Sequence, residues 1–152
     1  MADRSVRTIL TNMCMITDGS KVLVEEKILA DGQTGIIFPG GHVEAHESVT
    51  DSVIREIREE TGLTVFSPKL CGIKDWMEDD GSRYIVFLYR ADSFYGELRS
   101  SEEGRVFWVE RKALDTLPLI WNLKETMAVF ETDRYCEVFY PEDSEDEIPV
   151  LL

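Results

Sequence analysis

The sequence predicts a single α/β (α+β) domain in which a mixed β-sheet is covered by helices on both faces. Two observations lead to this fold class. Strand-like apolar segments are interleaved with two segments of helical periodicity, and 152 residues fit one domain with a full core better than two small ones. No internal repeat or long linker divides the chain. We expect the domain to span residues 1–140, followed by an acidic, mobile tail at 141–152.

The first elements expected are two strands joined by a tight turn. Arg7–Ile16 is a good strand candidate, Thr17–Ser20 supplies an Asp-Gly turn, and Lys21–Glu26 is a second strand. The pair is therefore predicted to form a hairpin. The chain then continues through a loop at Ile28–Gly35, a short apolar run at Ile36–Phe38, and Pro39-Gly40-Gly41.

A helix is predicted at Ser48–Thr61. Ser48 followed by Asp51 is a plausible capping box, and Gly62 occupies the position of a left-handed C-terminal cap. Further strands are expected at Leu63–Phe66, Lys69–Ile73, Arg83–Arg90 and Arg105–Val109. A second helix is expected from about Leu119 to Glu131, because Leu119, Leu123, Met127 and Phe130 recur at helical spacing.

Composition limits the possible partners. The net charge of -14 and the pI near 4.5 argue against binding a nucleic-acid polymer, which requires clustered Lys and Arg. No apolar stretch is long enough for a transmembrane helix, and the N-terminus lacks the pattern of a signal peptide. Cys14, Cys71 and Cys136 fit neither a disulfide framework nor a zinc site, so we expect reduced, mostly buried cysteines in a cytoplasmic protein.

Three glutamates crowd the predicted helix. Glu56, Glu59 and Glu60 lie within five positions, and each pair would repel by about 3 kcal/mol at an effective dielectric near 20. On a helical wheel with about 100° per residue, the three acids adjoin the apolar stripe. This arrangement implies either raised pKa values or a bound cation. The alternative is a solvated helix with Glu–Arg pairs, such as Arg55 with Glu59.

The preceding loop favours the cation. Pro39-Gly40-Gly41 permits a tight backbone path that brings carbonyl and N–H groups close to a ligand. Carboxylates together with a backbone carbonyl suit Mg²⁺, or Mn²⁺, and do not suit a soft metal. The sequence therefore predicts a site for a hard divalent cation.

These residues form a recognisable pattern. Gly41, Glu47 after five residues, and Arg55-Glu56-Ile57-x-Glu59-Glu60-x-Gly62-Leu63 after seven more resemble the Nudix box at all nine defined positions. The order of strands and the second helix also resemble the α/β/α sandwich of that family. The resemblance implies a Mg²⁺-dependent hydrolase acting on a nucleoside diphosphate linked to another group.

The resemblance also implies roles for individual residues. The metal ligands would be Glu56, Glu59, Glu60 and the carbonyl of Gly40, while Glu47 and Arg55 would pair and hold the loop against the helix. A proton acceptor is needed near the attacking water, and Glu60 and Glu103 are both candidates. Glu103 matches a loop glutamate that approaches the metals in MutT-like relatives, although it is equally compatible with a plain surface acid.

Substrate contacts are suggested at both ends of a nucleotide. Lys27 resembles a basic residue that contacts phosphate in some relatives, and Gly41 would allow close approach of the substrate. Trp121-Asn122 lies where MutT-type enzymes read a purine; the alternative is a core tryptophan followed by an asparagine N-cap. Trp76 and Trp108 are expected to pack. Ile36 and Ile37 replace an aromatic and a polar residue of some relatives, which leaves the substrate open.

The leading hypothesis is hydrolysis of a nucleoside triphosphate to monophosphate and pyrophosphate, with MutT-like sanitation of 8-oxo-dGTP preferred. Other nucleoside diphosphate derivatives, such as ADP-ribose, stay open. A non-catalytic nucleotide-sensing module on the same fold is the alternative from another class, but it would be expected to lack one or more box glutamates. We expect a small-molecule substrate, no membrane contact, and a monomer or homodimer.

Overall fold

A mixed eight-stranded sheet forms the centre of the protein in the computed structural model, which describes residues 2–142 and 148–152. Its order is β10-β9-β5-β6-β1-β2-β3, and β8 pairs with β2. The strands are Thr8–Asp18 (β1), Lys21–Ile28 (β2), Thr34–Ile37 (β3), Lys69–Met77 (β5), Arg83–Ala91 (β6), Arg105–Glu110 (β8), Glu137–Phe139 (β9) and Val150–Leu151 (β10). Leu63–Val65 (β4) and Phe94–Gly96 (β7) form a separate two-stranded sheet.

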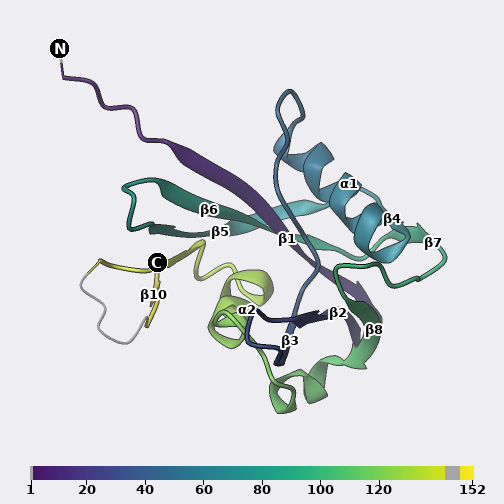
Figure 1. Ribbon diagram of the computed structural model, residues 1–152. Helices are drawn as coiled ribbons and strands as arrows, with labels where there is room; N and C mark the ends of the chain where they lie inside the picture. Colours follow the sequence, from purple (N-terminus) through teal and green to yellow (C-terminus); the bar gives the residue numbers. More distant parts are fainter. Residues whose placement is uncertain (1, 143–147) are drawn as a thin grey trace.

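Two α-helices lie on either side of this sheet (Figure 1). Helix α1 (Val49–Thr61) buries Val53 and Ile57 in one core cluster, and helix α2 (Leu123–Glu131) buries Leu123 and Phe130 in the other. A 3-10 helix, η1 (Arg111–Thr116), follows β8. The predicted fold class, an α/β/α sandwich around a mixed sheet, is confirmed.

The predicted N-terminal hairpin forms only at its tip. Strand β1 pairs with β2 at Thr17 and Asp18, whereas from Thr8 to Ile16 it runs parallel to β6. The other edge of β1 pairs with the glycine loop, Pro39-Gly40-Gly41. The backbone N–H groups of Asn12 and Cys14 donate to the carbonyls of Gly41 and Pro39. This long-range pairing brings the loop onto the central sheet and leaves no room there for β2.

Helix α1 has the predicted ends. The Ser48 hydroxyl accepts a hydrogen bond from the Asp51 backbone N–H at 3.0 Å, and Gly62 adopts a left-handed conformation with φ 77°. These contacts satisfy backbone groups that a helix end otherwise leaves unpaired. Both caps lie within a few residues of the helix, which is why the local sequence predicted them.

The prediction for the second helix was wrong at its start. Helix α2 begins at Leu123, because Trp121 and Asn122 both adopt left-handed backbone conformations, with φ of 52° and 54°. Two successive non-glycine residues in this region cannot continue a right-handed helix. The sequence also did not predict β7, β9, β10 or η1, which are short and carry little periodicity.

The expected mobile tail falls partly on residues 143–147, which lie outside the described residues. Further along, the expectation is wrong, since Val150 and Leu151 form β10 and pair with Phe139 and Val138 of β9. The apolar end of the chain therefore extends the sheet edge.

Three further expectations concern surface and interior. The cysteines are free, but only Cys14 is fully buried, since Cys71 is half-buried and Cys136 exposed. In the described part of the chain, no helix has the length and hydropathy needed to cross a membrane.

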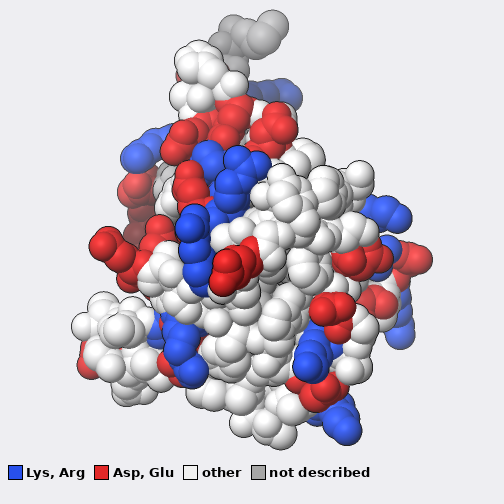
Figure 2. Space-filling view, turned by 90° about the vertical axis from the view of Figure 1, so that its right-hand side faces the viewer, with Lys and Arg blue, Asp and Glu red and all other residues white. Residues whose placement is uncertain are grey.

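On the face shown in Figure 2, basic side chains lie beside acidic ones around a broad uncharged area. That mixed pattern on this face is unlike the clustered basic surface of a nucleic-acid binder.

Candidate active site

Arg55 on α1 gathers acidic side chains around its guanidinium. It donates to both carboxylate oxygens of Glu47 at 2.7 and 3.0 Å, and to Glu56 and Glu59 at 2.9 and 3.2 Å. It also donates to the backbone carbonyl of His42 at 2.9 Å. The hydrogen bonds with Glu47 raise the pKa of Arg55 and lower the pKa of Glu47. The structure thus joins the glycine loop to α1 through the Arg55–Glu47 pair.

A side chain at Gly40 would collide with backbone, and one at Gly41 would displace the carboxylate of Glu56. A Cβ at Gly40 would lie 2.2 Å from the backbone oxygen of Asn12, and a Cβ at Gly41 would lie 2.3 Å from the carboxyl carbon of Glu56. The Gly40 N–H donates to Glu60 at 2.8 Å, and the Gly41 N–H donates to the Asn12 amide oxygen at 3.3 Å. The loop therefore lies directly against the acids of α1 because it carries no side chain there.

Lys27 on β2 is the centre of a second charged cluster. Its Nζ lies 3.5 Å from Glu25, 3.8 Å from Glu60 and 3.9 Å from Glu103. Glu25 and Glu60 are almost fully buried, whereas the Glu103 side chain is 63% exposed at the pocket rim. Burial, together with the charge of Glu25, raises the pKa of Glu60 to about 9. Lys27 opposes this shift, but one lysine does not neutralise three carboxylates.

The donor atoms of this cluster fit a hard divalent cation. Glu60 Oε1 and both carboxylate oxygens of Glu25 are buried without a hydrogen-bond partner among the described residues, apart from ion pairs with Lys27. Buried anionic oxygens without donors are costly unless a cation neutralises them.

The predicted ligands are not assembled into a finished metal site. Within residues 2–142 and 148–152, no group of three or more His, Cys, Asp or Glu side chains is arranged to hold a metal ion. Two basic residues divide the acids: Arg55 holds Glu56 and Glu59, while Lys27 lies against Glu60. Glu59 is also largely exposed, at 59% of its side chain.

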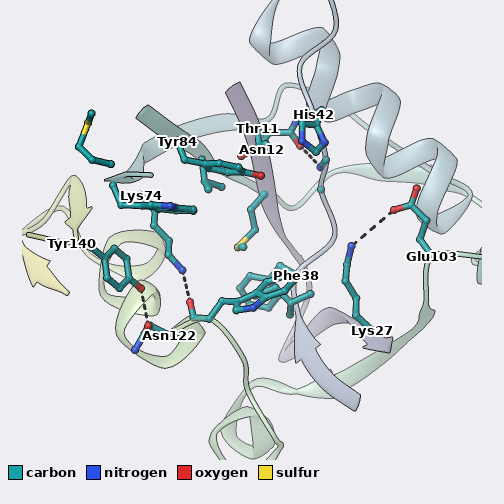
Figure 3. Close-up of a pocket in the computed structure, with 18 of the residues that line it drawn as sticks. Thr11, Asn12, Lys27, Phe38, His42, Lys74, Tyr84, Glu103, Asn122 and Tyr140 are labelled. Carbon is teal, nitrogen blue, oxygen red and sulfur yellow. Dashed lines mark hydrogen bonds and ion pairs between the residues drawn. The ribbon is translucent and has the colours of Figure 1, made fainter. Parts of the chain in front are cut away.

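A pocket of about 710 Å³ connects these charges to a second, aromatic end (Figure 3). Lys27, Glu103, Gly40, Gly41 and His42 line one side. Lys74, Asn122 and Tyr140 lie on the opposite side, and Trp76, Tyr84 and Trp121 also line the pocket. Four predicted substrate-contacting residues, Lys27, Gly41, Trp121 and Asn122, therefore share one cavity with Glu103.

Trp121 and Asn122 are placed by their left-handed backbone. Trp121 is 56% exposed, so the alternative of a core tryptophan is wrong. Asn122 occupies the N-cap position of α2 but its side chain makes no capping hydrogen bond. Its amide oxygen instead accepts from the Tyr140 hydroxyl at 2.7 Å, which leaves the amide N–H₂ group to donate.

Several pocket residues were not foreseen from the sequence. Asn12, Lys74 and Tyr140 line the pocket from separate segments and carry no motif. Glu25, which pairs with the pocket residue Lys27, carries no motif either. Trp76 was expected only to pack; it does stack on Tyr84, with ring centroids 4.5 Å apart, but both rings also line the pocket. A buried lysine or glutamate inside a strand has no spacing signal, so sequence reasoning had no means of selecting these residues.

Comparison with known proteins agrees with the Nudix-box pattern. Residues 7–148 match the NUDIX domain. A Bacillus subtilis protein named Uncharacterized Nudix hydrolase YvcI is 37% identical over 111 residues, covering 70% of this chain and 68% of that protein. An ADP-ribose pyrophosphatase from Methanocaldococcus jannaschii is 34% identical over 69 residues, covering 45% of this chain and 41% of the relative.

Among solved structures, the crystal structure of a MutT protein from Bacillus halodurans superimposes with a TM-score of 0.73 at 31% identity. The match covers 95% of this chain and 94% of that chain. The likeness thus extends over nearly the whole of both chains. With the domain match over most of its length, the chain belongs to the Nudix hydrolase family, whose enzymes use divalent metal ions to hydrolyse small nucleotide substrates.

Proposed function

We propose that this enzyme hydrolyses a nucleoside triphosphate to monophosphate and pyrophosphate with Mg²⁺, and that 8-oxo-dGTP is its preferred substrate. The observation that carries the proposal is the single pocket that joins the charged cluster to an aromatic, hydrogen-bonding end. A pocket with that polarity suits a molecule with phosphates at one end and a base at the other. Mn²⁺ is an acceptable replacement, since it prefers the same oxygen ligands.

The charged end would hold the phosphates. Glu56, Glu59, Glu60 and the Gly40 carbonyl would bind Mg²⁺, which supplies charge neutralisation on the phosphates and an acidified water. Lys27 would bind phosphate oxygens, and Gly41 would let them approach the backbone. Arg55 and Glu47 would keep the loop in register with α1 through their two hydrogen bonds.

Glu103 is the proton acceptor that we favour over Glu60. Glu60 already accepts the Gly40 N–H and lies buried beneath the loop, whereas Glu103 is accessible at the pocket rim. A general base must reach the water that it deprotonates, and an accessible carboxylate beside the phosphate-binding lysine meets that requirement.

The aromatic end would hold the base. Trp121 offers an exposed ring for stacking, and Asn122 offers an amide for one edge of a purine. The likeness to a solved MutT protein supports the triphosphate hypothesis. Because another relative is named ADP-ribose pyrophosphatase, ADP-ribose is tested as a second substrate class. We place the enzyme in the cytoplasm, in sanitation of the nucleotide pool ahead of DNA repair.

A nucleotide panel tests the proposal directly. The purified protein is incubated with Mg²⁺ and 8-oxo-dGTP, dGTP, dATP or ADP-ribose, and the products are separated by anion exchange. We expect 8-oxo-dGTP to give the highest kcat/KM, with pyrophosphate rather than phosphate released. If ADP-ribose has a higher kcat/KM than every triphosphate, the proposed substrate is wrong. If phosphate is released instead of pyrophosphate, the proposed site of cleavage is wrong.

A further inference from the structure

Lys74 is a buried basic residue at the aromatic end of the pocket, on the side opposite Lys27 (Figure 3). It is 5% exposed, and its neighbours across the sheet are Val86 on β6 and Val138 on β9. Lysine is rarely buried to this degree unless a carboxylate pairs with it. An apolar side chain of similar length would suit this row of the sheet better.

The ammonium group of Lys74 is incompletely satisfied. Its Nζ donates to the backbone carbonyl of Trp121 and lies 5.5 Å from the ring centroid of Tyr140. In the part of the chain that the structure describes, it has no carboxylate within ion-pair distance. An ammonium has three protons, so this geometry leaves donors for a ligand in the pocket.

The charge state of Lys74 fixes its role as a donor. Burial lowers the pKa of Lys74 to about 8, and the charge of Glu125 opposes this shift. The ammonium is therefore still the main form at neutral pH. It can donate to an oxygen or ring nitrogen, but it cannot accept from an amino group.

The side-chain amide of Asn122 is also placed to donate a hydrogen bond. Since Asn122 turns its oxygen toward Tyr140, its N–H₂ group is the part that remains to donate. Two donors from different elements, β5 and the turn before α2, thus lie at one end of the pocket. Such an edge pairs with a base that presents carbonyl oxygen and is mismatched to one that presents an amino group.

We propose that Lys74 is a specificity-determining residue that donates a hydrogen bond to the 6-oxo group of a purine, so that 6-oxopurine nucleotides are selected over 6-aminopurine nucleotides. The proposal rests on the proposed function, because it places the base at this end of the pocket. It adds a substrate class defined by the chemistry of one ring position. The loss of one such contact should reduce the discrimination between the two classes by about tenfold or more.

A matched nucleotide pair isolates that ring position. dITP carries an oxygen at position 6 and dATP an amino group, and neither carries a 2-amino group. For the native enzyme with Mg²⁺, we expect kcat/KM for dITP to exceed that for dATP by on the order of tenfold or more. In Lys74→Met, which keeps length and packing, the ratio should fall towards one, while Lys74→Arg should keep part of the preference.

A control separates base reading from a structural role, since Lys74 also holds the strained turn at Trp121. Lys124→Met removes the same charge from the exposed face of α2 and should leave the dITP/dATP ratio unchanged. If Lys74→Met lowers kcat/KM for both nucleotides equally, or leaves the ratio intact, the inference is overturned and the proposed function stands.

Product binding keeps the test independent of turnover. Binding of dIMP and dAMP is measured by calorimetry for the native protein and for Lys74→Met. Native preference for dIMP that is lost in the variant supports Lys74 as a base reader, even if no triphosphate is hydrolysed. Equal binding of both monophosphates by the native protein contradicts the inference.

Discussion

At the scale of single residues, two basic side chains each pair with some of the acidic residues of the site. Arg55 binds Glu47, Glu56 and Glu59, and Lys27 lies against the buried Glu60. The repulsion among the clustered glutamates is therefore partly offset by Arg55 and Lys27, which lie far apart in the sequence. Of the side chains that we assign to a metal ion, Glu60 keeps one buried oxygen without a hydrogen-bond partner among the described residues, while Glu56 and Glu59 are held by Arg55.

Replacing Glu56 by glutamine tests that assignment. The substitution removes ligand charge but keeps the shape of the side chain and its ability to accept from Arg55. Since disturbing residues that merely support a metal ligand costs about 10–100-fold, we expect loss of a ligand to lower Mg²⁺-dependent kcat/KM by more than about a hundredfold. Steady-state kinetics with 8-oxo-dGTP measures the effect, and thermal melting verifies that the fold is intact.

Glu44→Gln is the matched control for this change. Glu44 also lies 4.0 Å from Arg55, but its side chain is 69% exposed and it is not among the assigned ligands. The Glu44→Gln variant should keep a kcat/KM within about twofold of the native value, because a weak surface ion pair contributes little. Full activity in Glu56→Gln would remove Glu56 from the metal site.

At the scale of secondary-structure elements, α1 and α2 differ in how far the sequence determines them. Helix α1 is bounded by Ser48 and Gly62, whose capping contacts are local. The start of α2 depends on Trp121 and Asn122, which are held in left-handed conformations while the Trp121 carbonyl accepts from Lys74 on β5. A contact across 47 positions cannot be read from periodicity.

The turn before α2 gives a prediction about substrate choice. Asn122→Ala removes the amide that Tyr140 orients and that faces the pocket. We expect discrimination between 8-oxo-dGTP and dGTP to weaken by about tenfold, with a smaller change in turnover, because a base contact adds specificity more than it adds chemical rate. The measurement is the ratio of the two kcat/KM values, and an unchanged ratio would exclude Asn122 from base recognition.

At the scale of the whole molecule, buried acids link the site to overall stability. The pKa of Glu60 rises from 4.5 to about 9 because the sheet, the loop and α1 together remove it from water. Between these values the folded, metal-free protein holds a proton that the unfolded chain releases. The free energy of unfolding must therefore fall as pH rises through this window.

This linkage predicts the pH dependence of melting. In the presence of a chelator, we expect the Tm to decrease from pH 5 to pH 8, and Glu60→Gln to reduce that slope because its side chain does not titrate. Glu25, whose pKa is raised by burial, and Glu137, whose pKa is raised by its hydrogen bond with Asp75, contribute to the residual slope. Adding Mg²⁺ at pH 8 should raise the Tm of the native protein more than that of Glu60→Gln. Identical slopes in both proteins would show that Glu60 does not hold the proton.

The sequence by itself determined the segment from Gly41 to Leu63: the helix, its caps, and the register of Glu47, Arg55 and the three acids. Helical geometry and capping act over a few residues, so local spacing predicted the helix and its caps, and the resemblance to the Nudix box supplied the pairing of Glu47 with Arg55. The tertiary structure decided the rest of the pocket. Lys74 and Tyr140 reach it from β5 and the segment after β9, and Glu25 reaches the adjoining Lys27 cluster from β2, through sheet pairings such as β1 with β6 and β5 with β9. Those pairings depend on the packing of distant segments into one core, and no local pattern encodes which side chains they bring together.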